Sequence, residues 1–218
     1  MAATQETKPY EYYYGERAEM MAFYPESARV VLDVGCAAGN FALALKQKYG
    51  AEVWGLEYEA EAAQQAAEKL DKVLAGDCAL NMPLLPDAYF EVIFFNDVLE
   101  HLVDPYSVLQ MAKNKLKPGG QIISSIPNVR YFRNLGNLLF KKQWKYEESG
   151  ILDRTHLRFF TTRSIQEMYQ ELGYEILQHW GINATSRSWK PFLVNLLTFN
   201  TFSDIRYVQF VTVARPRA

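Results

Sequence analysis

The sequence has little cysteine, almost no net charge and no long apolar run. Its 218 residues include two cysteines, Cys36 and Cys78, and no CxxC pair, so neither a disulfide framework nor a zinc site is indicated. The net charge of −2 is unlike the strong positive excess of general nucleic-acid binders, and we expect no nucleic-acid partner. The polar N-terminus has no apolar signal core and no run reaches membrane-spanning length, which favours a cytoplasmic protein.

Apolar strands alternate with helices along most of the chain. This alternation at short spacing predicts an α/β fold built on a parallel sheet. We expect strands over 29–34, 51–57, 71–77, 89–97, 121–127, 174–182 and 206–215, and helices over 15–24, 40–49, 59–70, 104–116 and 164–172.

Two segments interrupt this rhythm. The segment 128–161 is aromatic and basic, and the segment 183–204 is apolar but irregular. Long connections in a compact domain are usually functional, and ligands of open α/β sheets sit at the carboxyl ends of the strands. We therefore expect an N-terminal tail and cap helix over 1–28, followed by one domain over 29–218 in which both segments form a substrate cap.

Acidic residues follow three of the expected strands. The stretch VLDVGCAAG leaves its strand at Asp33 and turns through small residues to Gly39, an arrangement that is weak evidence of a dinucleotide site by itself. Glu57 ends the second strand, about 20 positions further on, where a carboxylate accepts hydrogen bonds from ribose hydroxyls. Asp77 ends the third strand, where it can accept from an adenine amino group. Together these residues predict an adenosine-type cofactor.

These stretches, together with FFNDVLEHL after the fourth strand and LKPGG before the fifth, resemble the class I S-adenosylmethionine-dependent methyltransferases in order and spacing. The resemblance covers about 30–126. It implies a Rossmann-like, doubly wound sheet of seven strands, six parallel and the last antiparallel, with S-adenosylmethionine as cofactor. The stretches IPNVRY and DRTHLRFFT resemble a subgroup that acts on sugars and cell-surface polysaccharides, which points to polysaccharide biosynthesis.

The resemblance assigns cofactor contacts to the ends of the first four strands. The turn after the first strand would face the methionine part, and the later strand ends would hold the ribose, the adenine and the reaction centre. The assigned residues are Asp33, Gly35, Cys36, Ala37, Gly39, Glu57, Tyr58, Asp77, Cys78, Asn96 and Asp97. The family often has glycine where this chain has Ala37. We expect a negative φ at Ala37, which a side chain tolerates.

An acceptor hydroxyl must lose a proton during methyl transfer, and histidine is the natural general base near neutral pH. His101 follows the fourth strand, and His156 lies in the basic segment, three residues after Asp153. Asp97 and Glu100 are further catalytic candidates, while packing at the start of the next helix is the structural alternative for His101. His179, in a late strand, is expected to be structural. We expect no metal site.

The basic segment leaves three interpretations open. It carries eight basic and three acidic residues between 128 and 163, and can be a solvated helix face, the binding surface of an anionic acceptor, or a contact with a membrane surface. The residues assigned to the acceptor are Arg130, Tyr131, Asp153, Arg154 and Arg158. The apolar segment 191–202 is also a candidate surface for a homodimer.

The sequence thus predicts an S-adenosylmethionine-dependent methyltransferase that methylates an oxygen of a sugar or another small polar acceptor, using a histidine base. N-methylation of a small amine is the alternative within the class, because a neutral amine attacks without a strong base. A non-catalytic scaffold protein with the same fold is the rival from another class, and a dehydrogenase is a third hypothesis. Binding of the cofactor product, or of NAD, separates these hypotheses.

Overall fold

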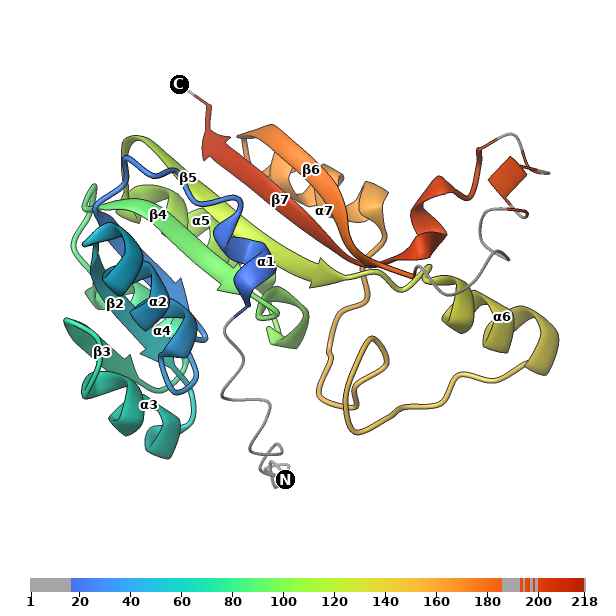
Figure 1. Ribbon diagram of the computed structural model, residues 1–218, viewed down its shortest axis with the longest axis horizontal. Helices are drawn as coiled ribbons and strands as arrows, with labels where there is room; N and C mark the ends of the chain where they lie inside the picture. The colour runs from blue at the N-terminus through green and yellow to red at the C-terminus, as the bar shows by residue number, and fades with distance from the viewer. Residues whose placement is uncertain (1–16, 186–192, 194, 197, 199, 218) are drawn as a thin grey trace.

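The computed structural model describes residues 17–185, 193, 195–196, 198 and 200–217, and its strands form one sheet (Figure 1). The strands are β1 (Val30–Val34), β2 (Glu52–Glu57), β3 (Lys72–Ala75), β4 (Phe90–Asn96), β5 (Leu116–Pro127), β6 (Tyr174–Ala184) and β7 (Tyr207–Pro216). The α-helices are α1 (Ala18–Met21), α2 (Asn40–Tyr49), α3 (Ala60–Ala67), α4 (Cys78–Asn81), α5 (Pro105–Lys115), α6 (Phe132–Lys141) and α7 (Thr162–Glu171). Three short 3₁₀ helices are η2 (Met82–Leu84), η3 (Leu99–His101) and η4 (Ser203–Arg206).

The sheet has the order β3-β2-β1-β4-β5-β7-β6. Every pair from β3 to β5 is parallel, and β7 runs antiparallel to both of its neighbours, β5 and β6. The predicted fold class is therefore confirmed. The strand order reverses at β1, whose neighbours are β2 on one side and β4 on the other. Such a reversal leaves a crevice outside the carboxyl ends of the strands, where ligands bind in open α/β sheets.

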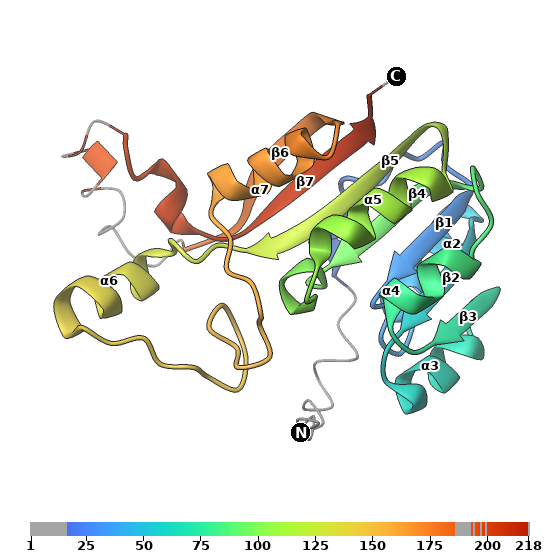
Figure 2. The same ribbon diagram turned by 180° about the vertical axis from the view of Figure 1, so that it is seen from behind.

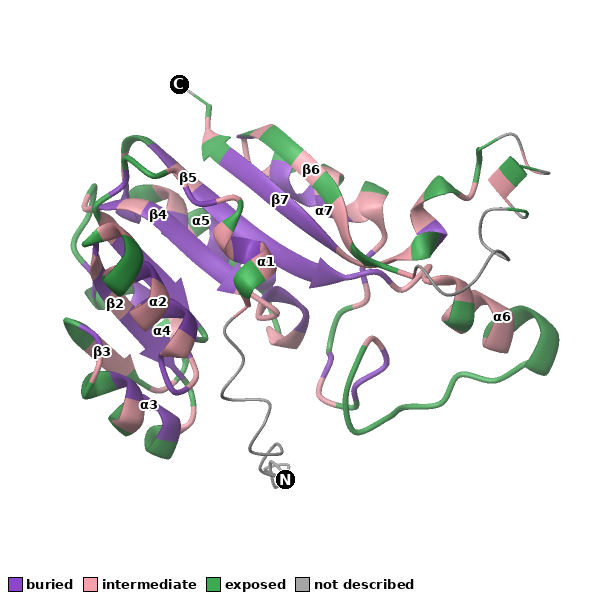
Figure 3. Ribbon diagram, in the orientation of Figure 1, coloured by how far each residue is buried: buried purple, intermediate pink, exposed green. Residues whose placement is uncertain are grey.

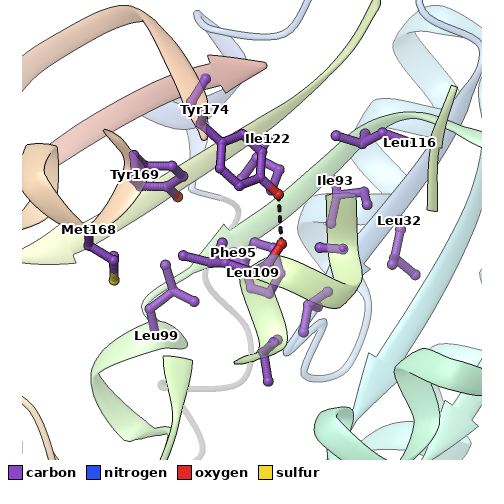
Figure 4. Close-up of a cluster of buried hydrophobic side chains, with 14 of the residues drawn as sticks. Leu32, Ile93, Phe95, Leu99, Leu109, Leu116, Ile122, Met168, Tyr169 and Tyr174 are labelled. Atoms are coloured by element: carbon purple, nitrogen blue, oxygen red, sulfur yellow. Dashed lines mark hydrogen bonds between the residues drawn. The ribbon is translucent and has the colours of Figure 1, made fainter. Parts of the chain in front are cut away.

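Helices cover both faces of the sheet (Figures 1 and 2). On one face Met20 of α1 and Phe41 of α2 pack with Phe94 of β4, and on the other face α5 and α7 pack over β4 and β5. Figure 4 shows part of this second core, in which the hydroxyl of Tyr174 donates a hydrogen bond of 2.6 Å to the carbonyl of Leu109. A buried phenol thereby finds the polar partner that it needs.

The segment 128–161 leaves the sheet at the carboxyl end of β5 and returns to the loop after β4. It contains α6, which the sequence did not predict and which has no buried residue, so that it stands out from the compact body in Figures 1 and 3. On the return, the backbone N–H groups of Leu157 and Arg158 donate to the carbonyl of Glu100, at 2.9 and 3.0 Å. These bonds anchor the end of the segment beside the site.

Parts of other predictions lie outside the described residues. These are the N-terminal tail over 1–16 and part of the second cap segment, at 186–192, 194, 197 and 199, which includes part of the proposed dimer surface over 191–202. The cap helix predicted over 15–24 is the single turn α1. None of the described helices has the length and apolar character needed to cross a lipid bilayer.

The turn after β1 corrects the prediction made for Ala37. Its φ is +48°, so Ala37 lies in the left-handed region between Gly35 and Gly39, whose φ angles are +72° and +78°. The conformation points the N–H of Ala37 at a carboxylate oxygen of Glu57, 2.7 Å away. The N–H of Gly39 closes the turn on the carbonyl of Cys36 at 2.8 Å. The expected negative φ is wrong, because the hydrogen bond from the N–H of Ala37 to Glu57 holds the strained backbone in place.

Replacement of Ala37 by glycine should therefore stabilise the protein. A left-handed residue with a side chain costs about 1–2 kcal/mol, of which the greater freedom of glycine in the unfolded chain offsets about 0.4–1 kcal/mol. We expect Ala37→Gly to raise the free energy of unfolding by about 0.5–1 kcal/mol, measured by urea denaturation.

The neighbouring Ala38 is the matched control. It is fully buried and has no positive φ, so Ala38→Gly should lower the free energy of unfolding. A destabilisation of similar size in both variants would contradict the strain at Ala37.

Candidate functional site

A cavity of about 660 Å³ opens at the carboxyl ends of β1, β2, β3 and β4. The loop after each of these strands contributes to its wall, as expected for strands that all point to the same edge of the sheet. Every residue that the sequence assigned to the cofactor lines this cavity, with the exception of Gly39. Gly39 precedes α2 as its N-cap, and a Cβ there would come within 3.1 Å of the Cα of Ala66 in α3.

Two buried oxygens at the inner end of the cavity have no hydrogen-bond partner among the described residues. They are Oδ1 of Asp33, at the end of β1, and Oδ1 of Asn96, at the end of β4. Buried polar atoms are rarely left without a partner, so these acceptors indicate a ligand that donates hydrogen bonds. The ammonium group of a methionine moiety is a donor of this kind. The residues present thus fit the cofactor that the sequence predicts.

Gly35 keeps this end of the cavity open. Its φ is +72°, and a Cβ built on it would stand 2.5 Å from Cγ2 of Val98, in the loop after β4. A side chain at this position would therefore clash with the opposite loop. The backbone N–H of Gly35 donates to the carbonyl of Leu56 at 2.7 Å, which fixes the turn against β2.

Glu57 joins the first two loops of the site. One carboxylate oxygen accepts from the N–H of Ala37 at 2.7 Å, and the other accepts from the N–H of Glu59 at 2.9 Å. Each oxygen keeps further acceptor capacity for a ligand hydroxyl. Burial raises the pKa of Glu57, and the backbone N–H groups act in the opposite direction. The geometry suits a carboxylate that receives both vicinal hydroxyls of a ribose.

Asp97 is the most heavily engaged side chain of the site. One carboxylate oxygen forms an ion pair with Arg17, and the other accepts from Gln209 at 2.6 Å and from the hydroxyl of Ser125 at 3.2 Å. Arg17 also donates to the Ser125 hydroxyl at 2.8 Å and lines the cavity. Asp97 has a left-handed φ of +54°. These contacts hold Asp97 and Arg17 at the border of the cavity.

The three histidines occupy different environments. His101 lines the cavity, and its Nδ1 lies 3.2 Å from the carbonyl of Thr155. His156 is 8% exposed and does not line the cavity, but its ring centroid is 4.6 Å from that of His101. His179 bonds Thr162 and Thr212 through its two nitrogens and stacks on Phe210, and burial lowers its pKa to about 4. His179 therefore has the structural environment that the sequence predicted.

The loop after β4 also forms a group of metal-ligating type. One carboxylate oxygen of Glu100 and one nitrogen each of His101 and His156 lie within 4.8 Å of one another. The sequence singled out both histidines as bases and predicted no metal. It could not show that residues 55 positions apart meet, because their contact depends on the return of the segment 128–161.

The residues assigned to the acceptor fall into two groups. Arg130 pairs with Asp204 at 2.8 Å, and the hydroxyl of Tyr131 contacts that of Thr185 at 2.5 Å, so both are tied to the second cap segment and neither lines the cavity. Asp153, Arg154 and Arg158 belong to the returning segment beside His101 and His156, and they do not line the cavity either. Asp153 is buried, and its Oδ1 accepts from the hydroxyl of Thr155 at 2.7 Å.

The model of one protein family, described as a methyltransferase domain, matches residues 8–179. The chain belongs to this methyltransferase family. Its cofactor is S-adenosylmethionine, in agreement with the donors and acceptors that line the cavity. The methyltransferase fold also explains why the strand ends carry the site.

Individual relatives agree with this family. The methyltransferase is 28% identical over 190 residues to a ubiquinone biosynthesis O-methyltransferase of Vibrio cholerae, covering 82% of this chain and 71% of the relative. It is 35% identical over 107 residues to a protein of the same name from Pseudomonas paraeruginosa, and spans 47% of this chain and only about half (46%) of that relative. A solved S-adenosylmethionine-dependent methyltransferase of Archaeoglobus fulgidus has the same fold, with a TM-score of 0.63, 21% identity, and coverage of 91% of this chain and 90% of that one.

Four residues of the methyltransferase site carry no sequence signal that singles them out. Arg17 and Gln209 lie far from the motifs along the chain, and Ser125 and Thr155 are small polar residues within an expected strand and an expected cap. The order of the strands in the sheet and the return of the segment 128–161 bring these residues to the site. Asp97 and His101, which they contact, were both predicted from the NDVLEH stretch.

Glu57→Gln should weaken cofactor binding. The amide retains the shape of the side chain but loses the charge, and one of its two polar atoms can no longer accept a hydrogen bond. A hydrogen bond to a charged group contributes about 1.5–3 kcal/mol, so we expect the Kd for S-adenosylhomocysteine, measured by calorimetry, to rise about 10- to 100-fold. Glu61→Gln, on the exposed side of α3, is the control and should leave the Kd unchanged. Equal affinities in wild type and Glu57→Gln would refute the ribose contact.

Asp33 should make stability depend on pH. Burial, and after it the charge of Glu57, raises the pKa of Asp33 to about 8, so the native state holds this proton far more tightly than the unfolded chain does. Stability is then lost as the pH rises from about 4 towards 8. Asp33→Asn has no such proton, so its stability does not fall in this way. The free energy of unfolding of Asp33→Asn minus that of wild type should therefore be larger at pH 8 than at pH 5, by at least about 1 kcal/mol. Urea denaturation of the ligand-free proteins at both pH values measures this, and a constant difference would contradict the assignment.

Proposed function

We propose that this methyltransferase transfers the methyl group of S-adenosylmethionine to a hydroxyl oxygen of a small polar acceptor, and that the acceptor is a sugar or a related glycan unit. Two relatives are named O-methyltransferases, which supports an oxygen nucleophile. The sugar class rests on the IPNVRY and DRTHLRFFT stretches of the sequence. The observation that carries the proposal is the position of His101 on the cavity wall.

His101 is the histidine placed to activate the acceptor. It follows the end of β4 by five residues and shares the cavity with Asn96 and Asp97, where the cofactor methyl group is expected. The carbonyl of Thr155 can only accept, so Nδ1 of His101 is the protonated nitrogen and Nε2 carries the lone pair. His156 does not line this cavity; it lines a second, more open hollow together with Arg154 and Leu157. The proposed base is therefore His101, with His156 as its neighbour.

The chemistry requires alignment and removal of one proton. The acceptor oxygen forms its new bond to the methyl carbon while the bond from this carbon to sulfur breaks and its electron pair returns to sulfur, leaving a neutral thioether. The hydroxyl proton passes to Nε2 of His101. Alignment of the two reactants by the cavity supplies most of the rate, and a positioned base contributes about 10²- to 10⁴-fold.

Arg158 supports an acceptor that carries negative charge. Its guanidinium is exposed and donates to the carbonyl of Val103 at 2.5 Å, and Val103 lines the cavity. A cation is thus held at the rim of the site, where a carboxylate or phosphate of the acceptor would meet it. Arg154 is also exposed and pairs with Glu148 at 2.5 Å.

Other features predicted from the sequence stay predictions. A membrane-surface contact is supported by α6, in which Leu139 and Phe140 are 65% and 87% exposed and Arg133 and Lys141 supply positive charge. A cytoplasmic location, the homodimer and the absence of a nucleic-acid partner have no further support in the described residues.

His101→Gln should lower turnover without a comparable loss of cofactor affinity. Because the base acts only as the acceptor is deprotonated, we expect kcat to fall about 100-fold or more and the Kd for S-adenosylhomocysteine to change by less than about threefold. Release of S-adenosylhomocysteine measures turnover with hydroxyl acceptors such as glucuronate and catechol, and with the amine ethanolamine. A rise of turnover with pH, which deprotonation of the base produces, should be present in wild type and absent from the variant.

His179→Gln is the matched control, because His179 is half-buried on β6 and does not line the cavity. It should retain wild-type turnover. If His101→Gln is fully active with an amine acceptor, and neither wild type nor this variant is active with hydroxyl acceptors, the result would contradict O-methylation and indicate N-methylation. Absence of S-adenosylhomocysteine binding at millimolar concentration would leave the scaffold hypothesis.

A further inference from the structure

Three groups with metal-ligating atoms converge beside the acceptor end of the cavity. Glu100 and His101 are neighbours in η3, directly after β4, and His156 comes from the returning segment. One ligand atom from each lies within 4.8 Å of the other two, and Nε2 of His156 is 3.9 Å from Oε1 of Glu100. That last distance is too long for a hydrogen bond, so these two atoms approach a common point without bonding one another.

Glu100 is the group that most needs a partner. It is 1% exposed, and neither of its carboxylate oxygens accepts a hydrogen bond from the described residues. A buried carboxylate without compensation is costly. The negative charges of Asp97 and Asp153 add to this cost, and the positive charge of Arg17 offsets it only in part. A cation among these side chains would remove the penalty.

Both histidines are oriented as metal ligands are. Nδ1 of His156 lies 3.0 Å from the carbonyl of Ile151, and Nδ1 of His101 lies 3.2 Å from the carbonyl of Thr155. Since a carbonyl only accepts, each Nδ1 carries the proton and each Nε2 carries the lone pair. Metal-bound histidines almost always donate their second N–H to a carbonyl or carboxylate in this way.

A second layer of contacts fixes one of these partners. Thr155, whose carbonyl accepts from His101, donates from its hydroxyl and from its backbone N–H to Oδ1 of Asp153, at 2.7 and 2.8 Å. Asp153 is itself buried. The orientation of His101 is thereby set by a chain of hydrogen bonds, an arrangement that is expected around a built metal site.

We propose that Glu100, His101 and His156 bind one divalent transition-metal cation, such as Zn²⁺, Mn²⁺ or Co²⁺. Two imidazoles and one carboxylate favour these ions over Mg²⁺, which prefers oxygen ligands. Ligand atoms about 2.0–2.2 Å from such an ion lie about 3–3.5 Å apart, so binding would draw the three groups together by up to about 1.5 Å. Rotation of the side chains supplies a movement of this size.

The role of the ion rests on the proposed transfer of a methyl group to a hydroxyl oxygen, and in the metal-bound protein it changes one step of that proposal, the removal of the proton. Three protein ligands leave coordination positions open, and His101 places the ion next to the cavity. The oxygen of the acceptor hydroxyl would occupy an open position, lose its proton to solvent because the cation stabilises the alkoxide, and attack the methyl group as described above. His101 would then hold the ion rather than take the proton itself.

Direct titration of the metal tests the site. Wild-type protein freed of metal with a chelator should bind one equivalent of Co²⁺, seen by calorimetry and by the visible absorption of a nitrogen-ligated ion. Glu100→Gln and His156→Gln each remove a ligand and should weaken Co²⁺ binding at least about tenfold. His179→Gln and Glu61→Gln, which change a histidine and a carboxylate elsewhere, should bind Co²⁺ as wild type does.

Stability and cofactor binding make the outcomes distinguishable. Co²⁺ should raise the Tm of wild type but not that of His156→Gln, which reports on the site even if Glu100→Gln folds poorly. Wild-type protein that binds Co²⁺ no more tightly than both ligand variants, with no shift in Tm, would overturn the inference.

If that wild-type protein still binds S-adenosylhomocysteine, and turnover is lost in His101→Gln, the metal inference fails while the proposed O-methyl transfer stands. If it binds metal but transfers no methyl group, the proposed function fails instead.

Discussion

The carboxylate of Glu57 holds the cofactor end of the site together. It bonds the N–H of Ala37 in the turn after β1 and the N–H of Glu59 after β2, so two loops from neighbouring strands share one anion. The left-handed backbone of Ala37 depends on this contact, and the shape of the turn depends on Ala37. The group that we expect to bind the ribose thus also holds together the two loops that form the pocket around it.

The site is strongly acidic for its size. Asp33, Glu57, Asp97 and Glu100 all lie at the carboxyl ends of three adjacent strands or in the loop after β4, and Arg17 is the cation among the described residues that contacts them directly. Such crowding is unfavourable in the free protein, as the raised pKa values of Asp33 and Glu100 indicate. A positively charged sulfonium and ammonium relieve it. Protonation of Asp33 removes part of this crowding in the free protein, and a positively charged cofactor offers the remaining carboxylates a partner of opposite charge.

The sequence was sufficient for the sheet and for most of the polar residues that line the cavity at the strand ends, because both depend on local patterns. Apolar strands that end in Asp33, Glu57 and Asn96 must bring these residues to one edge once the sheet is parallel. Side-chain periodicity carries no information on φ, which is why Ala37 was misjudged. It is equally silent on the meeting of Glu100 with His156, since that contact is decided by the path of the chain between 128 and 161. Contacts that depend on the path of a long loop become evident only in the three-dimensional structure.

Asp97 has a further consequence for how the protein is made. Its partner Arg17 is the N-cap residue of α1, and its partner Gln209 lies in β7. Arg17 precedes Asp97 along the chain and Gln209 follows it, so the ribosome releases Arg17 well before Gln209. Until β7 has inserted between β5 and β6, the Asp97 carboxylate lacks the hydrogen bond from Gln209, and the border of the pocket is incomplete. A nascent chain should therefore acquire its affinity for the cofactor in one late step, rather than gradually as the sheet grows.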